Sequence, residues 1–209
     1  MEVQEHFYSD DPSRGPVDGK TTLRGVDYFF LGNGLIQAAV QVTPAEGATQ
    51  VGLLVMDPEH LGPKRAALTF DRGSGIKATA LSLATAGVVR SARGGSVRAR
   101  WIPGVPDPRV EISWRSGPVR VRELFFCPDM GQARLLRRVT VSRTADGGAS
   151  VRLKTGVGSK TVETVLAFRG RGTKTAVFEY ALKRRGAEPA VTISLATPSD
   201  IEPRSAGYW

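Results

Sequence analysis

Few residues of this chain belong to the types that do chemistry, and they lie far apart in the sequence. The only histidines are His6 and His60, and the only cysteine is Cys127. His6 lies in a polar stretch, and His60 ends the turn-like run Asp57-Pro58-Glu59-His60. Neither histidine is near a Gly-x-Ser-x-Gly elbow, and a turn accounts for the two carboxylates. No catalytic residue is therefore expected in this chain.

Cys127 and the histidines also bear on metals and compartment. Cys127 follows Leu124-Phe125-Phe126 and precedes Pro128, which predicts a small buried hydrophobe at the end of a strand. A single cysteine allows no intrachain disulfide, so nothing indicates an oxidising compartment. One cysteine and two histidines are too few for a structural zinc site. We expect no metal and no cofactor.

Two glycine-rich segments have the composition of phosphate-binding loops. They are Gly156-Val157-Gly158-Ser159-Lys160-Thr161 and Gly170-Arg171-Gly172-Thr173-Lys174-Thr175. Both lack the adjacent Gly-Lys pair of a Walker A motif, and no helix follows to supply a dipole and free amides. We interpret both as hairpin loops between strands.

Trp101 and Trp114 are the candidate carbohydrate-binding residues. Exposed aromatic faces serve as platforms for sugars and for nucleic-acid bases. Each tryptophan ends an alternating run and falls in phase with its apolar members: Val97, Ala99 and Trp101 in one run, Val110, Ile112 and Trp114 in the other. This phase favours packing in the core over a binding platform.

The elements that must position these residues are strands. Asp27–Leu31 and Leu35–Val42 are β-type runs on either side of Gly32-Asn33-Gly34. Asn-Gly between apolar runs is a strong hairpin signal, because both residues tolerate a positive φ. Asn33 is the only asparagine of the chain. A hairpin is predicted here.

Short β-favouring runs then recur to the end of the chain, separated mostly by Gly, Pro, Asp or Ser. They are Gln50–Met56, Ala66–Phe70, Ile76–Leu83, Val97–Ile102, Arg109–Trp114, Val119–Phe126, Ala133–Ser142, Ser150–Thr155, Thr161–Phe168, Thr175–Leu182 and Ala190–Ala196. Such spacing is typical of a sandwich or barrel. The best helix candidate, Thr79–Val89, is also compatible with a strand and a turn. An all-β fold with few or no helices is predicted, as a large antiparallel β-sandwich.

Charge is distributed unevenly along the chain. Residues 1–62 hold 3 Lys+Arg against 9 Asp+Glu, and residues 63–209 hold 26 against 11, for the overall net charge of +9. A basic excess favours nucleic acid or another acidic partner. Many arginines, however, occupy the polar positions of alternating strands, which indicates a solvated sheet face.

Length and segment composition predict one domain. All-β domains often reach the 209 residues of this chain. Residues 1–23 form an irregular polar lead-in, 24–197 the sandwich and 198–209 a linker-like segment ending in Tyr208-Trp209. No signal peptide and no apolar run of membrane-spanning length is visible, so a soluble, cytoplasmic protein without membrane contact is expected.

Two segments resemble the N-terminal domain of bacterial glycoside hydrolases and phosphorylases of the glucoamylase-like, maltose phosphorylase-like and cellobiose phosphorylase-like groups. One is Phe29–Gly34 with its Gly-Asn-Gly turn, and the other is Val119–Phe126 with Pro128, leading into Ala133–Val141. The resemblance implies a β-supersandwich of the galactose mutarotase-like kind. It also implies a following linker and a helical (α/α)6 barrel that holds the catalytic carboxylates, and that barrel is missing from this chain.

The resemblance leads to one expected function and two alternatives. The expected function is a non-catalytic N-terminal domain of a carbohydrate-active enzyme, packed on a helical barrel, with loops that shape the substrate cleft or a homodimer contact. The first alternative is a free-standing carbohydrate-binding or assembly module, which predicts an exposed aromatic strip. The second is a basic nucleic-acid-binding β domain, which predicts arginines and aromatics interleaved on one face. The placement of the charges disfavours this last reading.

Overall fold

The computed structural model of the protein describes residues 27–33, 35–43, 48–55, 67–68, 79–86, 88–91, 97–102, 108–128, 132–157, 159–185 and 188–196. Throughout this part of the chain the regular elements are strands, and no α-helix occurs. The strands are β1 (Asp27–Gly32), β2 (Ile36–Thr43), β3 (Ala48–Val55), β4 (Ala67–Leu68), β5 (Ser82–Thr85), β6 (Val88–Ser91), β7 (Arg98–Ile102), β8 (Arg109–Ser116), β9 (Val119–Phe126), β10 (Arg134–Arg143), β11 (Ala149–Val157), β12 (Lys160–Phe168), β13 (Gly172–Arg185) and β14 (Glu188–Ala196).

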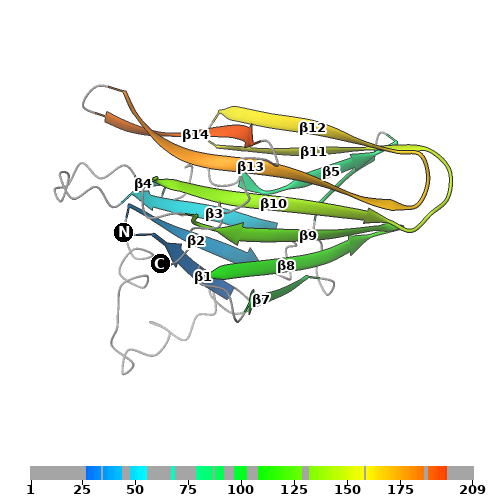
Figure 1. Ribbon diagram of the computed structural model, residues 1–209, viewed down its shortest axis with the longest axis horizontal. Helices are drawn as coiled ribbons and strands as arrows, with labels where there is room; N and C mark the ends of the chain where they lie inside the picture. Colours follow the sequence, from blue (N-terminus) through cyan, green and yellow to red (C-terminus); the bar gives the residue numbers. More distant parts are fainter. Residues whose placement is uncertain are drawn as a thin grey trace, which may run out of the picture.

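The strands form three antiparallel sheets (Figure 1). The six-stranded sheet has the order β14-β13-β10-β9-β8-β7. The N-terminal sheet has the order β1-β2-β3-β4. The split sheet, β12-β11-β5-β6, joins two hairpins from distant parts of the chain through the pairing of β11 with β5. The strands that lie between them in sequence belong to the six-stranded sheet.

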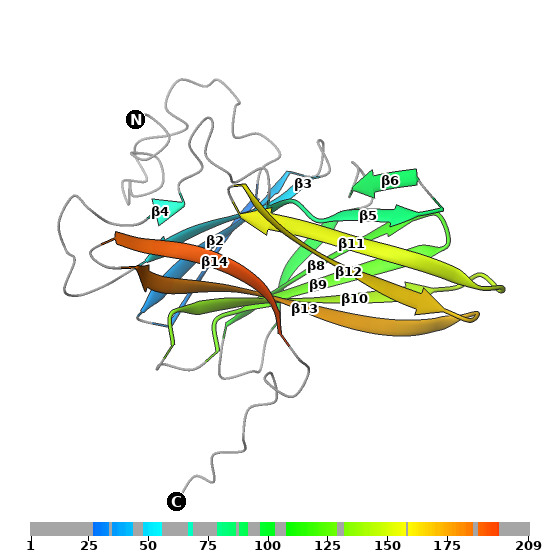
Figure 2. The ribbon, with the colours of Figure 1, turned by 90° about the horizontal axis from the view of Figure 1, so that it is seen from above.

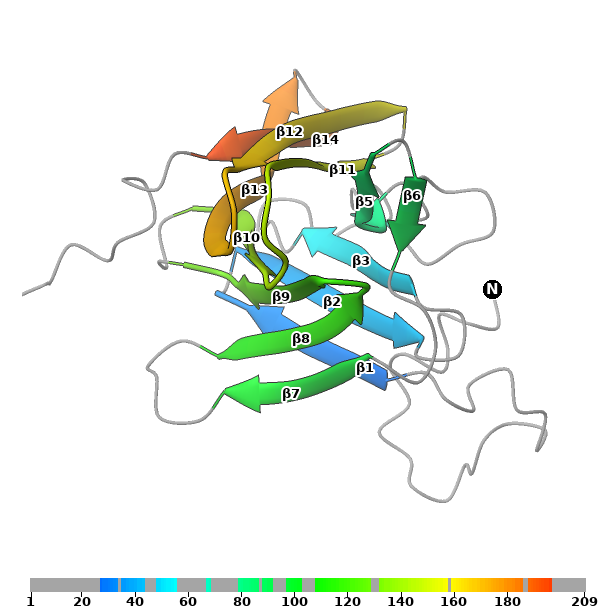
Figure 3. The same cartoon turned by 90° about the vertical axis from the view of Figure 1, so that its right-hand side faces the viewer.

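The sheets are arranged as a two-layer sandwich. The six-stranded sheet forms one layer, and the N-terminal and split sheets together face it (Figure 2). An end-on view shows the same arrangement, with β7 to β10 and β13 curving around β1 to β3 and β5 (Figure 3). One apolar cluster between the layers takes side chains from all three sheets, among them Leu31, Phe125 and Leu153. The all-β sandwich predicted from the sequence is confirmed.

Alternation along the strands decides which side chains enter this core. In β9, Val119 and Val121 are buried between the layers, whereas Arg120 and Arg122 are exposed on the outer face. Successive side chains of a strand point to opposite faces, so a strict alternation of apolar and charged residues gives one dry and one wet face. The solvated arginine face inferred from the sequence is confirmed for these strands.

The predicted first hairpin is present, but Asn33 acts differently from the sequence expectation. β1 pairs with β2 from Asp27↔Val42 to Gly32↔Gln37. Among the residues described, Ala86 is the one non-glycine residue with a positive φ, so the backbone of Asn33 is not left-handed. Its side chain stabilises the turn instead, because Oδ1 accepts hydrogen bonds from the backbone amides of Leu35 and Ile36, both at 3.2 Å. A side-chain oxygen that binds backbone amides two and three residues ahead stabilises such a loop directly.

Most predicted strands occur within a few residues of their expected bounds, and one region differs. Within Ile76–Leu83 the described strand begins only at Ser82, and β6 was not predicted. The helix candidate Thr79–Val89 forms no α-helix where it is described, because β5 turns at Ala86 into β6. No helix long and apolar enough to cross a membrane occurs in the described part. Residues 1–23 and 198–209, with Tyr208 and Trp209, lie outside it, as do His6, Asp57, Glu59 and His60.

Candidate functional site

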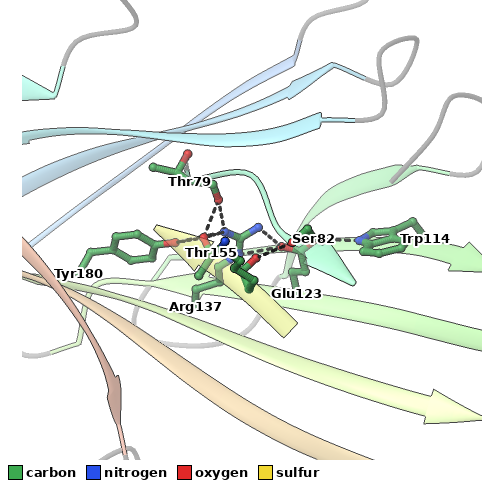
Figure 4. A network of polar contacts seen from close by, with 8 residues as sticks. Thr79, Ser82, Trp114, Glu123, Arg137, Thr155 and Tyr180 are labelled. Atoms are coloured by element: carbon green, nitrogen blue, oxygen red, sulfur yellow. Dashed lines mark hydrogen bonds and ion pairs between the residues drawn. The ribbon is translucent and has the colours of Figure 1, made fainter. Parts of the chain in front are cut away.

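The most concentrated polar chemistry of the described residues lies inside the core, between the two layers (Figure 4). Glu123 of β9 and Arg137 of β10 form an ion pair whose side chains are 1% and 0% exposed. Arg137 Nε donates to Glu123 Oε2 at 2.8 Å, and Trp114 Nε1 donates to Glu123 Oε1 at 2.7 Å. Both carboxylate oxygens therefore accept a hydrogen bond from the six-stranded sheet itself.

The far side of the Arg137 guanidinium reaches across to the other layer. Its Nη1 donates to the Thr79 carbonyl, to Thr155 Oγ1 at 3.2 Å and to Tyr180 Oη at 3.1 Å. Thr155 Oγ1 in turn donates to the Thr79 carbonyl at 2.9 Å. The guanidinium also lies 5.1 Å from the ring centroid of Phe125. Arg137 thus connects β10 and β13 with β11 and the segment that leads into β5.

The surroundings of Arg137 keep it charged. Burial by itself would lower the pKa of the guanidinium, because a low-dielectric interior disfavours the charged form. The Glu123 carboxylate and the Tyr180 hydroxyl act in the opposite direction and outweigh burial, so the pKa of Arg137 is raised above its ordinary value. The Arg137 guanidinium is consequently a fixed positive charge inside the core.

The cluster formed by Trp114, Glu123, Arg137, Thr155 and Tyr180 links the two layers and is enclosed in the core. All five side chains are buried, and the carboxylate and guanidinium are occupied by each other and by core partners. A buried pair with full hydrogen bonding fixes how surrounding elements fit, whereas catalysis requires contact with a reactant. We assign it a structural role.

Sequence reasoning missed Glu123 and Arg137, although a signal was present. In β9, Glu123 is in phase with Val121 and Phe125, and in β10, Arg137 is in phase with Leu135 and Val139. A charged residue in the buried phase of a strand requires a partner of opposite charge, since an unpaired buried charge is too costly. The neighbouring strands β9 and β10 each supply one.

The structure separates the two candidate tryptophans. Trp114 is 1% exposed, as its phase predicted. Trp101 is 46% exposed, so the prediction that it packs in the core is wrong. It belongs to β7, the edge strand of the six-stranded sheet, and the described residues add no further strand beyond β7. Its ring meets Phe29 of β1, an edge strand of the N-terminal sheet, edge-to-face at 5.6 Å. Phase alone does not distinguish an edge strand from a central one.

The outer face of the six-stranded sheet is the main charged surface of the described structure. Strands β7, β8 and β9 place five exposed arginines on it, which we call the arginine face: Arg98, Arg100, Arg115, Arg120 and Arg122. Further along the same sheet, Leu124, Phe126, Leu136 and Val177 form a second, buried apolar cluster. Arg109 and Arg138 lie over the Phe126 ring at 5.1 and 5.9 Å, so arginine side chains cover this cluster.

Of the two glycine-rich segments, the first is the predicted hairpin loop, whereas the hairpin prediction for the second is wrong. Gly156–Thr161 includes the β11–β12 hairpin, in which Val157 pairs with Lys160. Gly170 lies in the connection from β12 to β13, which crosses from the split sheet to the six-stranded sheet and is therefore not a hairpin. Its carbonyl accepts a hydrogen bond from Arg143 Nη1 at 3.3 Å. Cys127 is buried in the main core, directly after β9. Within the ranges that the structure describes, no three His, Cys, Asp or Glu side chains are grouped so as to hold a metal ion.

Comparison of the chain with models of known protein families, with curated proteins and with solved structures finds no match. Its function therefore has to be inferred from its own residues.

Proposed function

We propose that this chain is a non-catalytic β-sandwich domain of a carbohydrate-active enzyme, a glycoside hydrolase or phosphorylase. It packs on a helical catalytic barrel that belongs to the same parent protein and supplies the catalytic carboxylates. A cytoplasmic location is part of the proposal, because the single cysteine leaves disulfide bonding unused. The described surfaces fit this role, since the sandwich presents an outer arginine face and a half-exposed aromatic edge.

The observation that carries the proposal is a contact made by Asn33. The resemblance to the enzyme family depends on two segments, the Gly-Asn-Gly turn and the stretch from β9 through Pro128 into β10. Asn33 Nδ2 donates to the Pro128 carbonyl at 3.2 Å and to the Gln132 carbonyl at 2.7 Å. The two segments, almost a hundred residues apart, thus form one structural unit, which makes a joint origin of both motifs more plausible than two chance matches.

The reading frame downstream of the Trp209 codon tests this proposal. We expect it to encode a linker followed by a helical domain with two candidate catalytic carboxylates. The longer protein should release sugar from oligosaccharides by hydrolysis or phosphorolysis, whereas residues 1–209 alone should not. A stop codon directly after Trp209, together with no helical protein co-purifying from the native host, would overturn the proposal.

A second candidate function is favoured by Trp101 alone. A half-exposed tryptophan braced edge-to-face by Phe29 is a suitable platform for a sugar ring in a free-standing binding module. This function predicts that neutral oligosaccharides shift the fluorescence of the isolated chain and that Trp101→Ala removes the shift. Unchanged fluorescence with glucans, mannans and xylans at millimolar concentration would exclude it.

A further inference from the structure

The arginine face carries more positive charge than a sheet face needs to remain solvated. Its five arginines share one carboxylate, Glu111, whose Oε1 lies 2.9 Å from Arg100 Nη2 and whose Oε2 lies 3.1 Å from Arg122 Nε. Within the described part of the chain, Arg98, Arg115 and Arg120 make no ion pair. With Arg109, which lies over Phe126 on the same side of β8, the outer surface of β7, β8 and β9 carries six positive charges against one negative charge, a net charge of +5.

The arrangement of these charges is unfavourable for the chain alone. Arg115 and Arg120 are directly opposite each other across β8 and β9. Like charges in that position destabilise a sheet, and other carboxylates of the described structure are paired elsewhere, as Glu179 is with Arg134. An anionic ligand lying over β8 and β9 would relieve this repulsion. Binding of negative charge to this face would therefore stabilise the sheet.

The use of arginine rather than lysine narrows the class of ligand that this face can bind. All six basic residues on the outer surface of β7, β8 and β9, Arg109 included, are arginine, whereas exposed lysines such as Lys154 and Lys160 lie in the split sheet. The planar guanidinium binds carboxylate, sulfate and phosphate in a two-bond geometry that lysine cannot reproduce. The face is thus suited to planar or tetrahedral oxyanions held at defined positions.

Hydroxyl groups continue the face beyond the arginines. Ser142 is opposite Arg120 and Thr140 is opposite Arg122 across β9 and β10. Each hydroxyl pairs with a threonine of β13, Ser142 with Thr173 at 2.9 Å and Thr140 with Thr175 at 3.3 Å. Paired hydroxyls retain free acceptor positions, and one donor per pair can turn outward. Guanidinium groups beside a hydroxyl ladder match a chain that carries both carboxylates and ring hydroxyls.

Nucleic acid is the competing ligand, and the aromatic residues argue against it. Sheets that bind single strands stack bases on exposed aromatic rings. The aromatic side chain on the outer face of β7–β9 is Phe126, which is 3% exposed and lies under Arg109 and Arg138. The described part of this face therefore offers charge and hydroxyls without a stacking surface.

We propose that the arginine face binds an anionic polysaccharide through its uronate carboxylates. The inference rests on the proposed function in carbohydrate metabolism and names the substrate class that the domain presents to its catalytic partner. Arg115 and Arg120 hold successive carboxylates, Arg98 extends the site across β7, and the Ser142 and Thr140 hydroxyls meet the sugar rings.

Binding of polygalacturonate to residues 1–209, measured by calorimetry at low salt, tests the inference. The triple variant R98Q/R115Q/R120Q should weaken binding by about tenfold or more, since three charge-assisted contacts are lost. The matched control K154Q/K160Q/K174Q removes the same charge from exposed positions elsewhere and should change affinity by less than about twofold. Circular dichroism checks that both variants fold. R115K/R120K keeps the charge and should still weaken binding if planar recognition matters.

The outcomes separate this inference from the proposed function. Equal losses in both triple variants would reduce the effect to net charge and overturn the inference. Tighter binding to single-stranded or duplex DNA than to polygalacturonate, or no binding of the uronate polymer, would overturn it as well. None of these results affects the downstream reading frame, which tests the proposed function alone.

Discussion

Arg137 and Glu123 show what a buried charge pair does for this sandwich. Each group satisfies the other, and the guanidinium also reaches Thr155 and the Thr79 carbonyl in the opposite layer. Removing one partner strands the other charge in a dry interior, which is far more costly than the net contribution of the intact pair. The cluster thus favours one particular arrangement of the two layers, because any other arrangement would leave a buried charge unpaired.

The first prediction follows from this asymmetry. Arg137→Met should lower the free energy of unfolding by about 3–5 kcal/mol, because Glu123 is left buried and unpaired. The double variant Arg137→Met/Glu123→Leu should be more stable than Arg137→Met alone. Urea unfolding measures both. Arg171→Met, which breaks the exposed pair with Asp146, is the control and should cost about 0–1 kcal/mol. A double variant less stable than the single one would contradict the assignment.

A second prediction concerns pH. The folded-state pKa of Arg137 is raised, so the stabilisation from its charge is fully present below the unfolded-state pKa and is lost only as pH rises through the folded value. Both values lie in strong alkali. The stability difference between wild type and Arg137→Met should therefore not shrink between about pH 5 and pH 9. A difference that shrinks towards pH 9 would contradict the raised pKa.

At the scale of elements, the two glycine-rich segments differ sharply in how well they tolerate a side chain. A Cβ on Gly156 would lie 2.4 Å from the Lys160 carbonyl oxygen, whereas a Cβ on Gly170 would meet nothing within 4 Å. Gly156→Ala should destabilise the protein by about 1–3 kcal/mol, because backbone must move. Gly170→Ala, the matched control, should be neutral or slightly stabilising. Thermal unfolding of both variants checks this, and equal effects would show that the β11–β12 hairpin is looser than described.

The hairpin β1–β2 leads to a further prediction. Asn33→Ala removes the bonds to Pro128 and Gln132 and the caps on Leu35 and Ile36, and should cost about 1–2 kcal/mol. Asn33→Asp keeps the capping oxygen but places a carboxylate against two carbonyls, so it should be at least as destabilising. Ser159→Ala, in the exposed turn of another hairpin, serves as the control. Urea midpoints measure the differences, and a harmless Asn33→Asp would mean that the amide donor is unimportant.

Alternation predicted most of these elements because it records which face of a strand is dry. Val119–Phe126 became β9 with the predicted bounds, and Trp114 is buried as its phase required. Alternation along a strand does not show which strands and side chains lie next to one another in space. The exposure of Trp101 depends on β7 being an edge strand, and the Arg137 cluster depends on Thr79 and Thr155 arriving from the opposite layer. β6 was missed because its four residues follow a tight turn at Ala86 and are too short to show a period.

At the scale of the whole molecule, one apolar core joins three sheets whose strands come from different parts of the sequence. The split sheet is completed only when β11 pairs with β5, after the chain has passed through β7 to β10. Its core residues pack in the same cluster as those of the N-terminal sheet and the six-stranded sheet. Neither small sheet has a separate core in the described structure. Partial unfolding of one layer would therefore expose apolar surface of all three sheets.

The sandwich should consequently unfold in a single transition, although two of its sheets never pair with each other. Leu31→Ala in the N-terminal sheet and Leu153→Ala in the split sheet should each lower the free energy of unfolding for that single transition by about 2–5 kcal/mol. Val165→Ala, 52% exposed on β12, should have little effect. Trp114 fluorescence, followed in a Trp101→Phe/Trp209→Phe background, reports on the centre of the core and should coincide with far-UV circular dichroism. A Leu31→Ala protein that loses circular dichroism before Trp114 becomes solvated would show instead that the N-terminal sheet unfolds separately.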